Sequence, residues 1–246
     1  YQPFHPQYSY LFNSYYEQIG PYHPRARRGM LSRPTVDEVY RYRAWVDRHM
    51  TMLIDSVDEP SWPEVARLMS TGLNHEQQHQ ELLLTDIKHN FWNNPLYPAY
   101  REDLPETTGT AIALRWHEFE GGLTSIGAED VAFAYDNEQP CHTVYLDAWR
   151  LANRLVTNAE YLAFIEDRGY QRPELWLSDG WATVKREQWQ APLYWLRKGS
   201  EWLQFTLAGT RPLNVNEPVV HISFYEADAY ARWAGHRLPR EQEWEQ

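Results

Sequence analysis

The sequence contains a single cysteine, Cys141, and no long hydrophobic run. One cysteine cannot form an intrachain disulfide, and it cannot supply the several thiolates of a cysteine-ligated zinc or iron-sulfur centre. No apolar stretch approaches the ~18 residues of a membrane-spanning helix, and no charged-then-apolar leader is visible. These absences favour a cytoplasmic protein that has no membrane partner.

Basic residues are scarce as well. Lys and Arg number 23 against 34 Asp and Glu, which gives a formal net charge of -11. Because nucleic-acid binding needs a basic face, this balance argues against a nucleic-acid partner. Aromatic residues are plentiful, with 12 Trp and 17 Tyr among 246 residues. Rings with polar edges are common around ligand clefts, and a Trp-rich core is the plainer alternative.

The stretch from 74 to 89 has no Pro or Gly and is rich in strong helix formers, which predicts a helix. Its apolar side chains indicate a core-facing side and a buried helix; they are Leu82, Leu83, Leu84 and Ile87. His75 and His79 are four residues apart, so on a helix they lie one turn apart on one face and can reach a common ion.

The same pattern has other interpretations. With Glu76 it matches the HExxH spacing of zinc proteases, so proteolysis stays open on the motif alone. A plainer alternative is a pair of polar side chains on a helix face that bind nothing. The neighbouring amides of Gln77, Gln78 and Gln80 favour a polar cavity at this end of the helix.

A cluster of guanidiniums occurs near the N-terminus, where Arg25, Arg27 and Arg28 follow Pro24 on a short predicted loop. Arg presents a fixed fork of donors that pairs with carboxylates through two hydrogen bonds. The cluster therefore suits carboxylate recognition. A solvated basic loop in an acidic protein explains it equally well.

Capping signals predict two long helices in the first half. Thr35 with Glu38 forms a capping-box pattern, and that helix is expected to end near Ile54. Ser61 with Glu64 begins a second helix that continues into the histidine stretch. Two such helices make an antiparallel hairpin, and a bundle needs at least one more partner.

The second half changes character after a Pro-containing linker. The expected elements are strands within 116–126 and 143–146, helices at 157–165 and 223–234, and a loop-rich stretch stabilised by aromatics at 171–216. The chain begins at Tyr1 rather than Met, and residues 239–246 begin like a helix and then stop. We therefore expect a fragment of a longer protein.

Motifs along the whole chain resemble the ergothioneine-biosynthesis sulfoxide synthases (hercynine oxygenases). In the first half they are Tyr1-Gln2-Pro3-Phe4-His5-Pro6, Leu11-Phe12-Asn13-Ser14-Tyr15-Tyr16, Arg28-Gly29-Met30-Leu31-Ser32-Arg33-Pro34-Thr35 and the His75 to His79 stretch. In the second half they resemble a formylglycine-generating-enzyme (sulfatase-modifying factor) domain: Asn137-Glu138-Gln139-Pro140, Val156-Thr157-Asn158-Ala159-Glu160-Tyr161, Trp176-Leu177-Ser178-Asp179-Gly180-Trp181 and Gly235-His236-Arg237-Leu238-Pro239.

The resemblance implies an α+β protein with two domains. It implies a partial DinB-like helical bundle at 1–92, a linker at 93–112, and a C-terminally incomplete C-type-lectin-like domain, the formylglycine-generating-enzyme-like domain, at 113–246. The implied enzyme uses non-haem iron(II) and O2. It joins a cysteine-type thiol, either γ-glutamylcysteine or cysteine, to the imidazole C2 of N-α-trimethylhistidine (hercynine) and yields a sulfoxide.

The resemblance also assigns residues. His75 and His79 fall on two of three iron ligands, Gln78 falls on a residue that holds the hercynine imidazole, and Arg25 and Arg28 fall in the loop that binds the carboxylates of the thiol substrate. It places no role on Glu76. The third histidine of the family would precede Tyr1 and its catalytic tyrosine would follow Gln246, so no catalytic residue is assigned within the chain.

We therefore expect the 246-residue chain to be inactive and the intact protein to be an enzyme. By default the in-chain candidates for a third ligand are His5, His23 and His49, and surface or structural roles are favoured for each. Alternatives are an ovothiol- or selenoneine-type synthase of the same architecture, a non-catalytic module that binds a small ligand, and a DinB-type thiol transferase or zinc hydrolase.

Overall fold

The structure is a computed structural model that describes residues 2–13, 16–106, 108–129 and 133–246. The chain divides into two compact units, Tyr1–Met69 and Ser70–Gln246. The combination of helices and sheets confirms the mixed helix-and-sheet class expected from the sequence. Within the described residues, no helix has both the length and the apolar character that a membrane crossing requires.

The first unit is helical. Its elements are the short helix α1 (Tyr8–Leu11), the 3-10 turns η1 (Glu17–Ile19) and η2 (Arg25–Met30), the long helix α2 (Val36–Ser56) and the beginning of α3 (Trp62–Trp92). The capping box expected at the start of α2 is confirmed, since the Thr35 side chain accepts a hydrogen bond from the Glu38 N–H and Glu38 accepts one from the Thr35 N–H.

Helix α3 begins after Ser61, as predicted, but without the expected reciprocal cap. The Glu64 carboxylate pairs with Arg67 instead, and Asp58 accepts a hydrogen bond from the Ser61 N–H. Asp58 precedes the helix and so can cap the Ser61 N–H. Arg67 lies three residues after Glu64 on the same face of the helix, so it draws the Glu64 carboxylate away from the N-terminus.

The expectation that the histidine stretch forms a buried helix is wrong for the described chain. No α3 residue is buried, and Leu82, Leu83 and Leu84 are 48, 61 and 40% exposed. An apolar run on a helix is buried only where another element packs against it. Within the described residues, α2 and α3 are the only long helices, so the bundle partner that the pattern anticipates is missing there.

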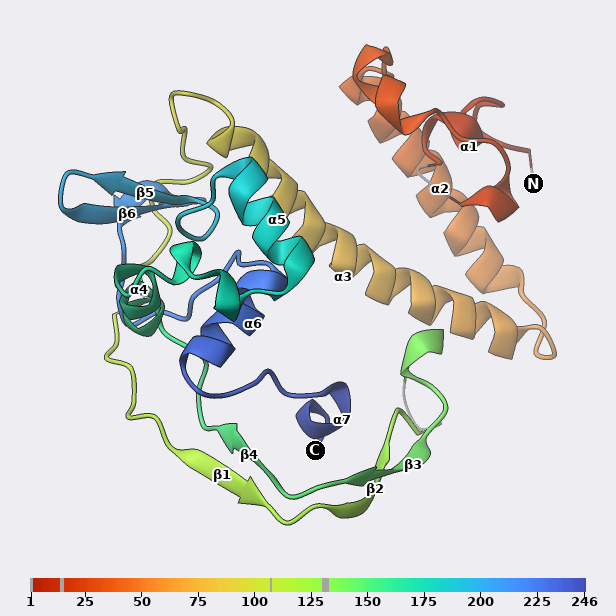
Figure 1. The fold of residues 1–246 in the computed structure, drawn as a ribbon. Coiled ribbons are helices and arrows are strands. Elements are labelled where there is room, and N and C mark those ends of the chain that lie inside the picture. Colours follow the sequence, from red (N-terminus) through yellow and green to blue (C-terminus); the bar gives the residue numbers. More distant parts are fainter. Residues whose placement is uncertain (1, 14–15, 107, 130–132) are drawn as a thin grey trace. The chain divides into compact units, whose positions relative to one another are not determined.

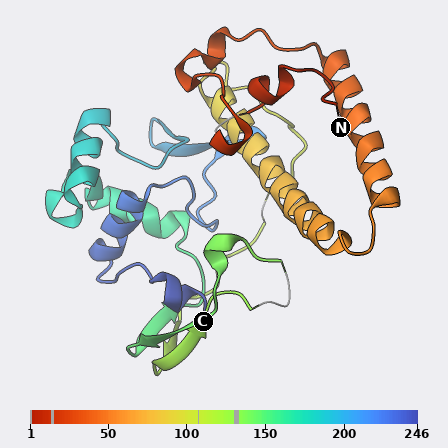
Figure 2. The ribbon, with the colours of Figure 1, turned by 90° about the vertical axis from the view of Figure 1, so that its right-hand side faces the viewer.

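The second unit contains three small antiparallel sheets. Strands β1 (Trp116–Phe119) and β4 (Trp149–Ala152) form the first, and β2 (Gly122–Ile126) pairs with β3 (His142–Leu146) in the second. The third sheet has the order β5 (Trp195–Lys198), β6 (Glu201–Thr206) and β7 (Gly209–Pro212). Figure 2 shows helix α7 (Glu241–Trp244) beside β2 and β3, where Glu245 and Gln246 bond to the β2 segment.

The core of this unit lies among three helices, namely α4 (Asn158–Glu166), α5 (Ser178–Glu187) and α6 (Phe224–Trp233), and the turns η4 (Gly169–Gln171) and η5 (Pro173–Leu175). Its buried members are Tyr161, Phe164, Tyr170, Leu175, Trp176, Val184 and Ala229. The loop-rich expectation for 171–216 is wrong, because this stretch contains α5 and the whole β5–β6–β7 sheet. Its many Trp residues obscure the alternation of apolar and polar positions that would have revealed short strands.

The segment after α3 is held against the third sheet. The N–H groups of Tyr100 and Arg101 donate to the Leu207 carbonyl, and Arg211 donates to the carbonyls of Glu102 and Leu104. The end of α3 is fixed to the same sheet by the Trp92 ring, whose centroid lies 5.8 Å from that of Phe205. A compact unit is defined by its internal contacts, whereas a domain boundary follows the limits of a family of sequences. The expected boundaries 1–92, 93–112 and 113–246 therefore stay predictions.

Candidate metal site and ligand cavity

The two histidines on α3 face each other. Their Nε2 atoms are 3.1 Å apart, and the ring centroids are 4.4 Å apart with the planes at 77°. Two nitrogen ligands that each lie about 2.1 Å from one ion and subtend a right angle are about 3 Å apart. The separation of the two Nε2 atoms is therefore that of two adjacent ligands of a single metal ion.

Among the residues that the structure describes, His75 and His79 do not belong to a larger group of metal ligands. In the described part of the chain, no three His, Cys, Asp or Glu side chains come together as a group that could hold an ion. Glu76 and Gln78 are exposed on α3, and Gln78 lies one helical turn from His75, next to the pair. The helix thus presents two imidazoles and an adjacent amide.

Arg25 and Arg28 belong to η2 in the first unit, whereas His75, Gln78 and His79 belong to the second, and each set is described within its own unit. Arg25 is exposed and Arg28 is partly buried, so the guanidiniums lie at the surface of their unit. The predicted roles of these five residues in binding metal or substrate stay predictions.

The three histidines of the first unit that could replace the third ligand have local partners. His5 accepts a hydrogen bond from the Gln7 N–H, and His23 bonds to the Tyr10 hydroxyl. His49 bonds to the carbonyl of Trp45 and its ring packs on that indole with centroids 3.9 Å apart. These contacts are compatible with the structural roles favoured for the three side chains.

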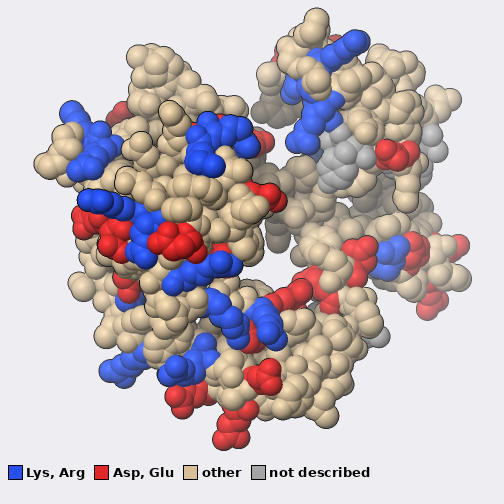
Figure 3. Space-filling view, in the orientation of Figure 1, with Lys and Arg blue, Asp and Glu red and all other residues tan. Residues whose placement is uncertain are grey.

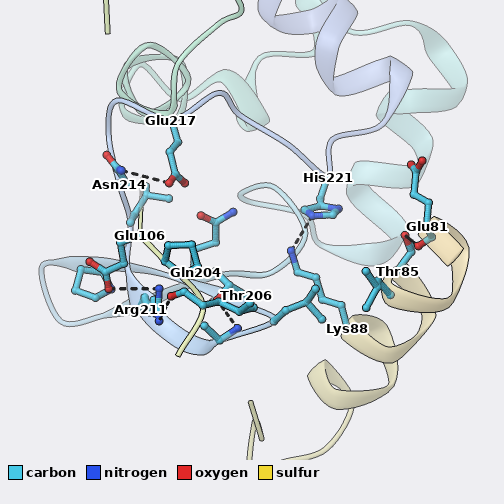
Figure 4. A pocket seen from close by; sticks show the side chains of 17 residues that line it. Glu81, Thr85, Lys88, Glu106, Gln204, Thr206, Arg211, Asn214, Glu217 and His221 are labelled. Atoms are coloured by element: carbon cyan, nitrogen blue, oxygen red, sulfur yellow. Dashed lines mark hydrogen bonds and ion pairs between the residues drawn. The ribbon is translucent and has the colours of Figure 1, made fainter. Parts of the chain in front are cut away.

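A cavity of about 640 Å³ lies within the second unit (Figure 4). Its walls come from α3, from residues 104–106, from β6 and β7, and from the loop at 213–221. This cavity is lined by the turns of α3 that follow His75 and His79, so it differs from the polar cavity predicted beside the two histidines. Glu81, Thr85 and Lys88 share a stripe on α3 that lies away from the two imidazoles, because positions 75 and 79 fall on a different face.

Lys88 and His221 meet at one wall of the cavity. The Lys88 Nζ lies 2.8 Å from His221 Nε2 and 4.6 Å from the centroid of the Tyr194 ring. Burial lowers the pKa of Lys88 to about 8, and burial together with the Lys88 charge lowers the pKa of His221 to about 4. At neutral pH a protonated Lys88 therefore donates to a neutral imidazole, and the His221 side chain is itself exposed.

Sequence reasoning missed Lys88, Gln204 and His221 as cavity residues. Lys88 and His221 are 133 positions apart, and Gln204 reaches the cavity only through the pairing of β6 with its neighbours. A polar residue inside an apolar strand, such as Gln204 between Leu203 and Phe205, was the one local signal available.

The comparisons with known proteins identify the class. The sulfatase-modifying factor enzyme 1-like domain matches residues 117–246, and the chain belongs to this family. This match covers β1 to α7 and supports the interpretation of the second half.

More particular similarity is to enzymes named hercynine oxygenase. That of Mycolicibacterium thermoresistibile is 34% identical over 228 residues, which are 91% of this chain and 48% of the relative. That of Mycolicibacterium smegmatis is 31% identical over 210 residues, 82% of this chain and 46% of the relative. A formylglycine-generating enzyme of Thermomonospora curvata is 32% identical over 169 residues, covering 60% of this chain and 53% of the relative.

These similarities confirm the family assignment made from the motifs. The chain spans about half the length of the curated relatives it matches. The hercynine oxygenase similarity extends over most of the chain, beyond the part that the domain match covers.

Proposed function

We propose that the natural gene product is an iron(II)-dependent enzyme of ergothioneine biosynthesis. It joins the sulfur of γ-glutamylcysteine or cysteine to the imidazole C2 of hercynine with O2 and gives a sulfoxide. The observation that carries this proposal is the 3.1 Å separation of the two Nε2 atoms of His75 and His79, in a chain similar over 91% of its length to a hercynine oxygenase. The single cysteine is in keeping with a cytoplasmic enzyme.

In this proposal His75 and His79 hold the metal through Nε2. A bound iron(II) would supply the redox chemistry that O2 requires, because side chains do not provide it. The Gln78 amide, one helical turn from His75, orients the hercynine imidazole by hydrogen bonding. Arg25 and Arg28 pair with carboxylates of the thiol substrate, because the guanidinium fork matches a carboxylate through two bonds.

The test is turnover of hercynine with γ-glutamylcysteine or cysteine under air, with sulfoxide detected by mass spectrometry. We expect product from the natural gene product loaded with iron(II), and at least a tenfold loss in His79→Ala. Glu76→Gln is the matched variant, because it leaves both imidazoles in place and should change turnover less than twofold. A product with histidine but not hercynine would favour the ovothiol-type alternative, and a selenium donor would test the selenoneine type.

Two further outcomes would overturn the proposal. A zinc hydrolase needs the Glu76 carboxylate, so zinc in the purified protein together with hydrolysis lost in Glu76→Gln would favour that class. Binding of a small ligand without turnover, unchanged in His75→Ala, would favour a non-catalytic module.

A further inference from the structure

Lys88 places a cation at one wall of the cavity. In the described part of the chain, no carboxylate lies within ion-pair distance of Lys88, whose neighbours are the neutral His221 imidazole and the Tyr194 ring. Lys88 is partly buried, so water compensates its charge only in part. An anion in the cavity would interact more strongly with this half-buried ammonium than with a fully exposed one, because the surrounding protein screens the attraction less than water does.

A second polar group faces the same space. Gln204 is 6% exposed and lines the cavity, and Figure 4 shows its side chain without a hydrogen bond to the other cavity residues drawn. Buried amides are normally satisfied by protein, water or ligand. Its NH2 group is therefore a donor available to a molecule in the cavity.

The backbone at this wall is strained. Tyr194 has φ +72° and His221 has φ +62°, both in the left-handed region that non-glycine residues rarely adopt. The centroids of the two rings lie 4.8 Å apart, and both rings contact the Lys88 ammonium. Strain of this kind persists where surrounding structure enforces it, and it clusters at ligand sites.

We propose that this cavity binds the carboxylate of a small molecule, with Lys88 as the cation and Gln204 as the neutral donor. The site is distinct from the His75 and His79 pair and independent of the proposed function. Glu81, Glu106 and Glu217 also line the cavity and would repel a second anionic group, and the other lining cation, Arg211, is already paired with Glu106 at 3.5 Å. The fitting class is therefore a monocarboxylate, with a neutral or cationic remainder, and not a phosphate or a dicarboxylate.

The test uses three probes of equal carbon length and different charge, which are butyrate, 4-aminobutyrate and butylamine, titrated without metal at pH 7. We expect the two carboxylates to bind and butylamine not to bind. Lys88→Met, which keeps an unbranched apolar side chain, should weaken butyrate binding at least tenfold. Lys185→Met on α5 removes a lysine outside the cavity and should leave binding unchanged.

Backbone amide chemical shifts of the unsubstituted protein locate the probe without any variant. Butyrate should shift the signals of Thr206 to Ala208 and leave those of His75 to His79 in place. Gln204→Leu gives a second, weaker loss if Lys88→Met fails to fold. Equal butyrate binding in wild type, Lys88→Met and Lys185→Met, preferred binding of butylamine, or shifts confined to the histidine stretch would each overturn the proposal.

Discussion

The carboxylate of Glu160 has three partners at the start of α4. It accepts two hydrogen bonds from the Arg154 guanidinium, at 2.8 Å each, and further bonds from the N–H and hydroxyl of Thr157. The Arg154 bonds chiefly, with those from Thr157, lower the pKa of Glu160 to about 2 against the opposing effect of burial. One side chain thus joins a helix cap to the residues that follow β4.

We expect Glu160→Gln to lower the free energy of unfolding by about 1–2 kcal/mol at pH 6.5, because bonds to a charged group are lost. The folded pKa of Glu160 is depressed from 4.5, so its stabilisation is complete above 4.5 and is lost as the pH falls toward 2. The difference between wild type and variant in urea denaturation should therefore be smaller at pH 3.5 than at pH 6.5.

Glu166→Gln is the matched control, since it changes an exposed carboxylate at the other end of α4 that has no ion pair in the described residues. Its effect should be within about 0.5 kcal/mol at both pH values. A difference for Glu160→Gln that grows on acidification would contradict the assigned cause.

Local residue patterns predicted local contacts well. The predicted box of Thr35 with Glu38 needs only a spacing of three residues and is present, whereas the one predicted for Ser61 with Glu64 gives way to an Asp58 bond and an ion pair with Arg67. The contact of Lys88 with His221 could not be foreseen, because it depends on how α3 packs beside the third sheet and not on any short pattern.

Among the elements, η4 and α6 are joined through a buried carboxylate. Glu226 is 4% exposed; its Oε1 accepts a hydrogen bond from the Tyr170 hydroxyl and its Oε2 accepts one from the Ser223 N–H. Tyr161 lies next to Tyr170, with 3.1 Å between the hydroxyl oxygens. Burial raises the pKa of Tyr170 well above its usual range, so its hydroxyl remains a donor at all ordinary pH values.

We predict that Tyr170→Phe costs about 1–3 kcal/mol of unfolding free energy, since it leaves a buried carboxylate oxygen without a partner. Tyr161→Phe keeps the bond between Tyr170 and Glu226 and should cost about 0.5–1 kcal/mol. Chemical denaturation of both variants measures the difference. Equal costs, or a larger cost for Tyr161→Phe, would show that the hydrogen bond from Tyr170 to the Glu226 carboxylate is not the main source of stability here.

Helices were easier to predict than sheets for a physical reason. Thr35, Thr157 and Ser223 mark helix starts through contacts within one turn, whereas β5, β6 and β7 exist only by pairing with one another. The exposed Leu82 to Leu84 run illustrates the limit on the helical side, because hydrophobicity indicates a buried face but does not supply the covering element.

For the molecule as a whole, the net charge and the sequence motifs were the main grounds for predicting its family and its partners. On the face drawn in Figure 3, basic and acidic side chains are interspersed in small groups and form no single basic surface, in keeping with the net charge of -11. The joined motifs of the two halves predicted the family, which the similarity to hercynine oxygenases together with the domain match confirms. The metal position that we propose within that family rests on the geometry of His75 with His79.

Anaerobic titration of the natural gene product with iron(II) tests the central claim most directly. His75→Ala and His79→Ala should each weaken iron(II) binding at least tenfold, because each removes one nitrogen ligand. His117→Ala, which removes an exposed imidazole on β1, should bind as wild type does, with all variants checked for folding by circular dichroism. Equal affinity in wild type and all three variants would contradict the account.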